Sequence, residues 1–154
     1  MTTRRSLLAA LALAPLAARA HHGWSSFDEG APIFLAGTLK SVRWTNPHAE
    51  GVLAVAAGLA LPADLAKRTV PPQSANVDGA AVLARATVPA QAAGDWTLEF
   101  APLSRMQAWG LAEAPAVGTR IEAVGYTGPK LGRLMRVEYL FIDGRAYGLR
   151  SSPR

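Results

Sequence analysis

The sequence predicts a mainly β protein: a small OB-like Greek-key barrel with one short helix, preceded by an N-terminal signal peptide. Two observations carry the fold. Short stretches that alternate between apolar and polar residues are separated by turn residues, as in a chain of β-strands. The one clear helical stretch falls between the third and fourth strands, which is where an OB barrel carries its helix.

The first two strands are expected on either side of an Asn-Pro turn. Residues 32–43 alternate roughly, and Gly37 within them indicates a bulge or a tight bend. Asn46-Pro47 ends this strand, because proline has no amide hydrogen and forces the residue before it into an extended conformation. Residues 50–57 then return as the second strand. His48 is therefore expected near the tip of a β-hairpin.

The remaining strands and the helix occupy the second half of the chain. Residues 94–101 form the third strand, with alternate apolar residues on one face, and residues 102–111 form the short helix. Residues 119–126 form the fourth strand. Residues 133–150 contain a fifth strand, a turn at Asp143-Gly144 and a returning strand, since Asp-Gly between extended runs is a strong hairpin signal.

A stretch at about residues 57–94 does not fit the barrel pattern. It is rich in alanine and proline and has no clean helical or strand period. We interpret it as an insertion between the second and third strands, partly loose, with short helical pieces. The expected domain organisation is a signal peptide (1–20), an N-terminal arm (21–31) and a barrel domain (32–150) that carries this insertion.

The first 20 residues have the features of a secretory signal. Arg4-Arg5 gives a positive start, and an uncharged run rich in leucine and alanine extends from Ser6 to Ala18. Ala18-Arg19-Ala20 fits the small-x-small pattern of a cleavage site. The run of about 13 residues is shorter than the roughly 20 that a membrane span needs. We expect cleavage after Ala20 and a periplasmic or secreted product, exported by either the general or the twin-arginine route.

Composition excludes several classes of function. Three of the 16 basic residues lie in the leader, so the mature chain has 13 basic and 11 acidic residues, a net charge of +2. This balance does not support nucleic-acid binding. The chain has no cysteines, so disulfides, thiolate metal sites and thiol chemistry are excluded. No second long apolar run follows the leader, so no membrane span is expected in the mature protein.

The three histidines suggest a metal site. Cleavage after Ala20 would leave His21 with a free amine of pKa about 8 and an imidazole of pKa about 6.5, two nitrogens that can chelate together. Nitrogen ligands in a tetragonal arrangement suit Cu(II). His48 would supply a third nitrogen if the arm folds back, with His22 as an alternative or additional ligand. Cleavage after Arg19 would instead place His22 third, which is also a copper-binding arrangement.

Neighbouring residues could complete this site. Asp28 and Glu50 are candidates to orient an imidazole or add oxygen ligands, and Trp44 and Asn46 are candidates for the wall of the site. The competing interpretation is that the histidines form a polar arm and a turn cap, and that the carboxylates are solvated. No catalytic residue is predicted.

Several stretches resemble the bacterial domain of unknown function 6152 family. They are AHHGWSSFDE, GTLKSVRWTNPHAE, DWTLEFAPLSRMQAWGL and the closing GYTGPKLGRLMRVEYLFIDGRAYGLR. The family's signatures, Ala-His-His at the cleavage point and Asn-Pro-His after the first strand, fall here on Ala20 to His22 and on Asn46 to His48. The resemblance covers nearly all of the mature chain except residues 57–94. It implies a small exported protein and points to the histidines without giving them a role.

The leading expectation for function is therefore an exported protein that binds a copper ion through His21, His48 and His22, for storage, delivery or sensing. A metal-free alternative is a binding module that uses the barrel face and Trp44 to hold a small molecule, a peptide or an envelope partner. An oxidative copper enzyme is the third class, for which the sequence offers no second catalytic group.

Overall fold

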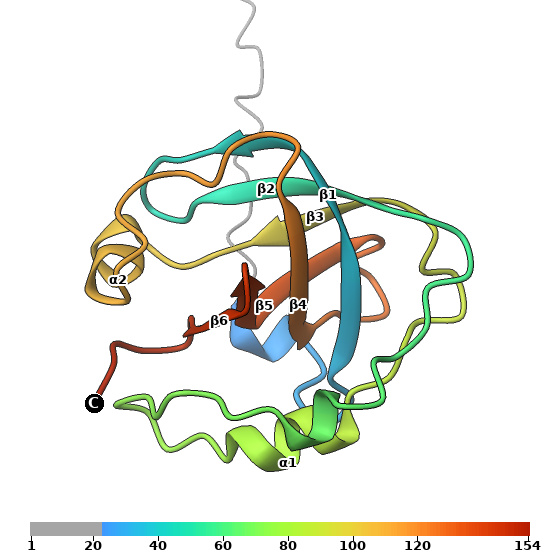
Figure 1. Cartoon of the computed structure of the whole chain (residues 1–154), viewed down its shortest axis with the longest axis horizontal. Helices are drawn as coiled ribbons and strands as arrows, with labels where there is room; N and C mark the ends of the chain where they lie inside the picture. Colours follow the sequence, from blue (N-terminus) through green and yellow to red (C-terminus); the bar gives the residue numbers. More distant parts are fainter. Residues whose placement is uncertain (1–22) are drawn as a thin grey trace, which may run out of the picture.

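A computed structural model of the protein describes residues 23–154 (Figure 1). The predicted signal peptide, His21 and His22 lie outside these residues. The elements in chain order are η1 (Trp24–Ser26), β1 (Ile33–Arg43), β2 (Glu50–Val55), η2 (Leu65–Lys67), α1 (Gly79–Arg85), β3 (Gly94–Glu99), α2 (Leu103–Ala108), β4 (Arg120–Tyr126), β5 (Leu134–Ile142) and β6 (Arg145–Gly148).

The first five strands close into a barrel, which confirms the predicted OB-like fold. Antiparallel pairs join β1 to β2, β2 to β3, β1 to β4 and β4 to β5. A short parallel pair between β3 and β5, Thr97–Glu99 against Leu134–Arg136, closes the ring. This is the strand connectivity of an OB barrel. The strand β6 pairs with β5 after the turn at Asp143-Gly144 and lies outside the ring.

The hairpin of β1 and β2 forms as its turn residues predict. The bond between Asn46 and Pro47 is cis, and the chain returns at Glu50. A Cβ on Gly37 would overlap the carbonyl oxygen of Ala54, so glycine is needed here for close approach of the two strands. The irregularity in pairing lies further on, between Leu39 and Ser41.

The predicted helix after the third strand is α2, and it is fixed to the β1–β2 turn. Pro102 precedes it, and the Leu103 amide donates to the side-chain oxygen of Asn46 at 3.1 Å. Met106 points into the core and is fully buried. Gly110, with φ of 78°, follows the last turn in the left-handed conformation that glycine adopts most easily. Within residues 23–154 no helix is both long and apolar enough to cross a membrane.

Two separate clusters of buried side chains stabilise the domain. The larger fills the barrel and includes inward-facing residues of all five barrel strands. The smaller lies on the outer side of β1, β4 and β5, where Phe34, Tyr139 and Phe141 meet Leu65 and Leu83 from the insertion. In Figure 1 the insertion, with α1, packs against one side of the barrel, and α2 lies elsewhere on its surface.

The expectation that residues 57–94 are partly loose is therefore wrong. Leu65 in η2 and Leu83 in α1 each have only 1% of their surface exposed. The side chain of Asp78 accepts a hydrogen bond from the Ala81 amide at 3.0 Å and so caps α1. The missing periodicity has a physical reason: the segment buries a few isolated apolar residues against strands that are distant in sequence, not a continuous stripe.

Candidate functional site

The described part of the N-terminal arm is docked on the barrel by its aromatic residues. The Trp24 ring faces the guanidinium of Arg150, whose central carbon lies 4.0 Å from the ring centroid, and that of Arg136 at 4.9 Å. Arg136 also lies over Phe27, at 4.3 Å. Tyr126 meets the edge of Trp24, with 6.3 Å between the ring centroids. Cation–π contacts of this kind hold a short segment in place without extensive backbone pairing.

Backbone contacts support the same docking. The Asp28 amide donates to the carbonyl of Thr127 at 2.8 Å, just after β4. A Cβ on Gly128 would overlap the carbonyl oxygen of Ser26, so the arm and this loop pack backbone to backbone. The arm therefore approaches the barrel along a defined path at residues 24–28.

His48 lies on the β1–β2 loop, as predicted, and shares a small cavity with Trp24. The cavity has a volume of about 50 Å³, and Arg105 and Arg136 also line it. Burial lowers the pKa of Arg105, whose guanidinium donates to the Leu149 carbonyl at 3.1 Å. The structure thus brings the arm and the hairpin histidine together at one place on the barrel.

A carboxylate that the sequence reasoning missed lies beside His48. The Nδ1 atom of His48 is 3.9 Å from Oε1 of Glu99, the last residue of β3. The same oxygen accepts a hydrogen bond from Nε of Arg136 at 2.9 Å. Glu99 and Arg136 are 9% and 8% exposed, so each charge is neutralised mainly by the other. Nothing in the sequence singles out this pair, because Asp95, Thr97 and Glu99 alternate with apolar residues as they do on a half-exposed strand.

The other predicted site residues have structural partners elsewhere. The Asp28 carboxylate accepts from the Gly30 amide at 3.0 Å and so closes its own turn. Glu50 forms an ion pair with Arg43 at 2.8 Å. Asn46 accepts the hydrogen bond from α2 described above. None of these three lines the cavity beside His48.

Trp44 packs on the core and is not part of this cavity. Its ring meets Phe100 edge-on, with centroids 6.3 Å apart, and its Nε1 donates to the carbonyl of Ala112 at 3.3 Å. The tryptophan next to His48 is Trp24.

No group of three or more histidine, cysteine, aspartate or glutamate side chains with the arrangement of a metal site occurs within residues 23–154. His48 is the one histidine in this range, because His21 and His22 lie outside it. Any site built on all three histidines therefore depends on where the first residues of the mature chain lie.

Comparison with known proteins gives one similarity. No curated protein and no solved structure matches the chain. Residues 9–60, a range that contains all three histidines, match the model of a family of unknown function (DUF6152). The match confirms that the N-terminal third of the chain resembles this family, as its motifs predict.

Proposed function

We propose that this is an exported protein that binds a copper ion through the histidines of its mature N-terminus and His48. The observation that carries the proposal is that Trp24 and His48 line the same cavity. Cleavage after Ala20 would make His21 the first residue, three positions before Trp24. The docked arm then ends close to the hairpin histidine.

Chain geometry permits the contact. Three residues span at most about 10 Å when fully extended, and fewer residues separate His22 from Trp24. If the chain before Trp24 continues toward the cavity, the amine and imidazole of His21, or the imidazole of His22, would come within range of His48 without any change in the described part of the arm. A retained leader would remove the free amine and with it the chelate.

The side chains around His48 fit such a site. Glu99 lies beside His48, with Oε1 at 3.9 Å from Nδ1, where a small approach would let the carboxylate orient the ring of a metal-bound histidine. Of the two arginines that line the cavity, Arg136 is compensated by Glu99, and Arg105 donates to the Leu149 carbonyl. Bound Cu(II) would be held by nitrogen ligands, which it prefers among the common divalent metals, and such a site suits storage, delivery or sensing.

The test uses protein exported by a bacterial host, with the mature N-terminus confirmed by mass. Cu(II) is titrated in the presence of a competing chelator, and the paramagnetic resonance spectrum is recorded. We expect one equivalent bound with nitrogen hyperfine structure, and tighter binding than by the free peptide His-His-Gly-Trp, because the folded domain adds His48.

Variants separate the domain site from the peptide alone. We expect His48→Ala to weaken binding by at least about ten-fold, down to the affinity of the peptide, because a nitrogen ligand is lost. Trp24→Ala should also weaken it, because the arm loses its docking contacts, whereas Lys67→Gln at an exposed position of the insertion should not. Equal affinities for the wild type, His48→Ala and the peptide would refute the proposal.

A further inference from the structure

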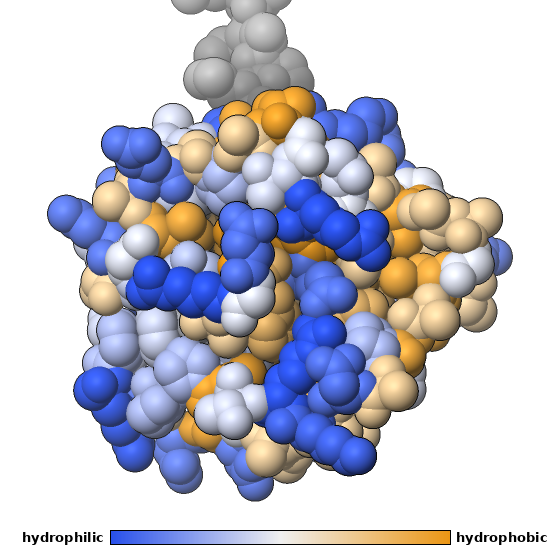
Figure 2. Space-filling model, in the orientation of Figure 1, coloured by the Kyte–Doolittle hydropathy of each residue, from blue (hydrophilic) through white to orange (hydrophobic). Residues whose placement is uncertain are grey.

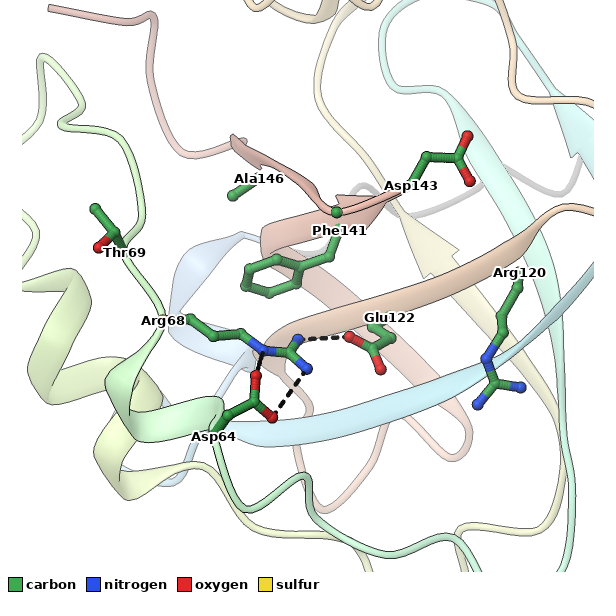
Figure 3. Close-up of a pocket in the computed structure, with 9 residues that line it drawn as sticks. Asp64, Arg68, Thr69, Arg120, Glu122, Phe141, Asp143 and Ala146 are labelled. Atoms are coloured by element: carbon green, nitrogen blue, oxygen red, sulfur yellow. Dashed lines mark hydrogen bonds and ion pairs between the residues drawn. The ribbon is translucent and has the colours of Figure 1, made fainter.

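A cavity with no role in the proposed copper site lies where the insertion meets β4 and the β5–β6 hairpin. It has a volume of about 570 Å³, in the range of small-molecule sites. Three segments build it: the insertion around η2, the start of β4, and the β5–β6 hairpin (Figure 3). Its lining includes Asp64, Arg68, Arg120, Glu122, Phe141 and Asp143.

One side of this cavity is held rigidly by Arg68. Its Nε donates to Asp64 at 2.8 Å within the insertion, and its Nη1 donates to Glu122 on β4. Its guanidinium also lies over the ring of Phe141, 5.3 Å from the centroid. The Arg68 guanidinium lowers the pKa of the Asp64 carboxyl, and the Asp64 carboxylate raises the pKa of Arg68. With two carboxylates bound, Arg68 fixes the insertion to the barrel and has little charge left for a ligand.

Two further charged residues line the cavity, Arg120 and Asp143, and both lie at one end of the β4–β5 pair. Glu122 is paired with Phe141 between these strands. Arg120 is the first residue of β4, two residues before Glu122, and Asp143 lies two residues after Phe141, in the turn that leads to β6. Arg120 and Asp143 are both exposed. Within residues 23–154, neither side chain has an ion pair or a hydrogen bond. Figure 3 shows their charged groups directed away from each other, with dashed bonds only around Arg68.

We propose that this cavity binds a small zwitterion of the amino-acid or short-peptide class. Arg120 would take the carboxylate, because a guanidinium matches carboxylate geometry, and Asp143 would take the ammonium group. The ligand would connect two opposite charges that the fold places at one cavity and does not pair. A purely anionic or purely cationic ligand would satisfy only one of them. Preorganisation by Arg68 leaves the wall ready for binding.

The described surface exposes few large apolar side chains. Hydrophobic residues on the face in Figure 2 lie in separate areas between hydrophilic ones. Among residues 23–154, Leu61 and Val117 are the large apolar side chains that are exposed, and they lie in different loops. A charged small molecule is therefore a better match to the surface than an apolar partner.

The test is a titration of the mature protein with the dipeptide alanyl-leucine, followed through backbone amide shifts in NMR. We expect saturable shifts at Arg120, Glu122 and Asp143. The N-acetylated dipeptide lacks the ammonium group and the dipeptide amide lacks the carboxylate, so each should bind about five-fold or more weakly than the parent. Equal binding by either analogue, or no shifts at these residues, would overturn the proposal.

Matched variants assign the two charges. Arg120→Gln and Asp143→Asn should each weaken dipeptide binding by roughly ten-fold, the usual effect of losing a charge-assisted bond. Asparagine keeps the positive φ of 50° at Asp143, so the turn is retained. Lys130→Gln and Glu113→Gln make the same charge changes at exposed positions outside the cavity and should bind like the wild type. His48→Ala should also bind the dipeptide like the wild type, because this cavity is separate from the proposed copper site. Loss of dipeptide binding in any of these control variants would refute the zwitterion site.

Discussion

At the scale of single residues, Arg150 joins the core to the N-terminal arm. Its Nε donates to Glu138 at 2.8 Å, and Glu138 is fully buried. Gln73 donates to the other oxygen of Glu138 at 2.8 Å, so the buried carboxylate is satisfied on both sides. The guanidinium of Arg150 also lies over the ring of Trp24. Arg150 therefore contributes both to the docking of the arm and to the neutralisation of a buried charge.

Tyr126 lies beside this network and makes the stability of the folded protein fall at alkaline pH. Burial, and then the negative charge of Glu138, raise its pKa to about 12, against about 10 in an unfolded chain. The folded protein thus keeps the phenol proton that the unfolded chain loses. The stabilisation is complete below pH 10 and is lost as the pH rises through 12. We expect ionisation of Tyr126 to lower the free energy of unfolding by about 2 kcal/mol as the pH rises from 10 to 12.

Denaturant titrations at pH 9, 10 and 11 test this expectation. Tyr126→Phe should show a shallower decline in unfolding free energy than the wild type, because phenylalanine does not ionise. Tyr147→Phe, at another buried tyrosine, serves as the matched control. Parallel declines for the wild type and Tyr126→Phe would show that other groups govern alkaline unfolding.

At the scale of elements, the barrel strands were predictable because their local pattern agrees with their final environment. Glu50–Val55 alternates because only one of its faces meets the core. Arg120–Tyr126 and Leu134–Ile142 are almost continuously buried, since the insertion or the network around Glu138 covers their outer faces. The runs IFLA in β1 and YLFI in β5, apolar on both faces, were the available sign that another segment covers these two strands.

The insertion should contribute to the stability of the fold although it has no regular apolar period. Leu83 on α1 is 1% exposed and belongs to the outer cluster with Phe34 and Tyr139. We expect Leu83→Ala to lower the free energy of unfolding by about 3 kcal/mol, from lost burial and the cavity left behind. Chemical denaturation followed by circular dichroism measures the change.

Arg85→Ala on the same helix is the control. Arg85 is exposed and donates to the carbonyl of Ala81 one turn earlier, so its loss should change stability by about 0.5 kcal/mol or less. If Leu83→Ala cost no more than Arg85→Ala, the insertion would be energetically separate from the barrel, contrary to its burial.

At the scale of the whole molecule, the candidate site was predictable only where its parts are local. The Asn46-Pro47 turn fixed the position of His48, and the hairpin is confirmed. Glu99 and the docking of Trp24 on Arg136 were not predictable, because they join segments that are far apart in the sequence and meet only when the barrel closes. The copper ligands themselves stay a prediction, since His21 and His22 lie outside the described residues.

The C-terminal segment shows the same dependence on distant contacts. Its residues bind the insertion by backbone and side-chain hydrogen bonds: Ser74 N to Ser152 O at 2.9 Å, Ala75 N to Ser151 Oγ at 2.7 Å, and Ser151 N to Gln73 Oε1 at 3.0 Å. The Ser151 carbonyl also accepts from Nε1 of Trp109 at 2.8 Å, just after α2. The last few residues therefore connect the insertion, the barrel and α2.

Ending the chain at Arg150 should loosen the insertion before the barrel. This truncation keeps the Arg150 side chain with Glu138 but removes the bonds made by residues 151–154, and we expect a loss of about 2–4 kcal/mol in unfolding free energy. Amide hydrogen exchange should accelerate at least about ten-fold at Ser74 and Ala75, which lose their acceptors, and also in α1. Exchange in β1 and β2 should rise only by the amount that global destabilisation requires. An equal acceleration in all elements would mean that insertion and barrel open as one unit, and the C-terminal segment would then act on global stability alone.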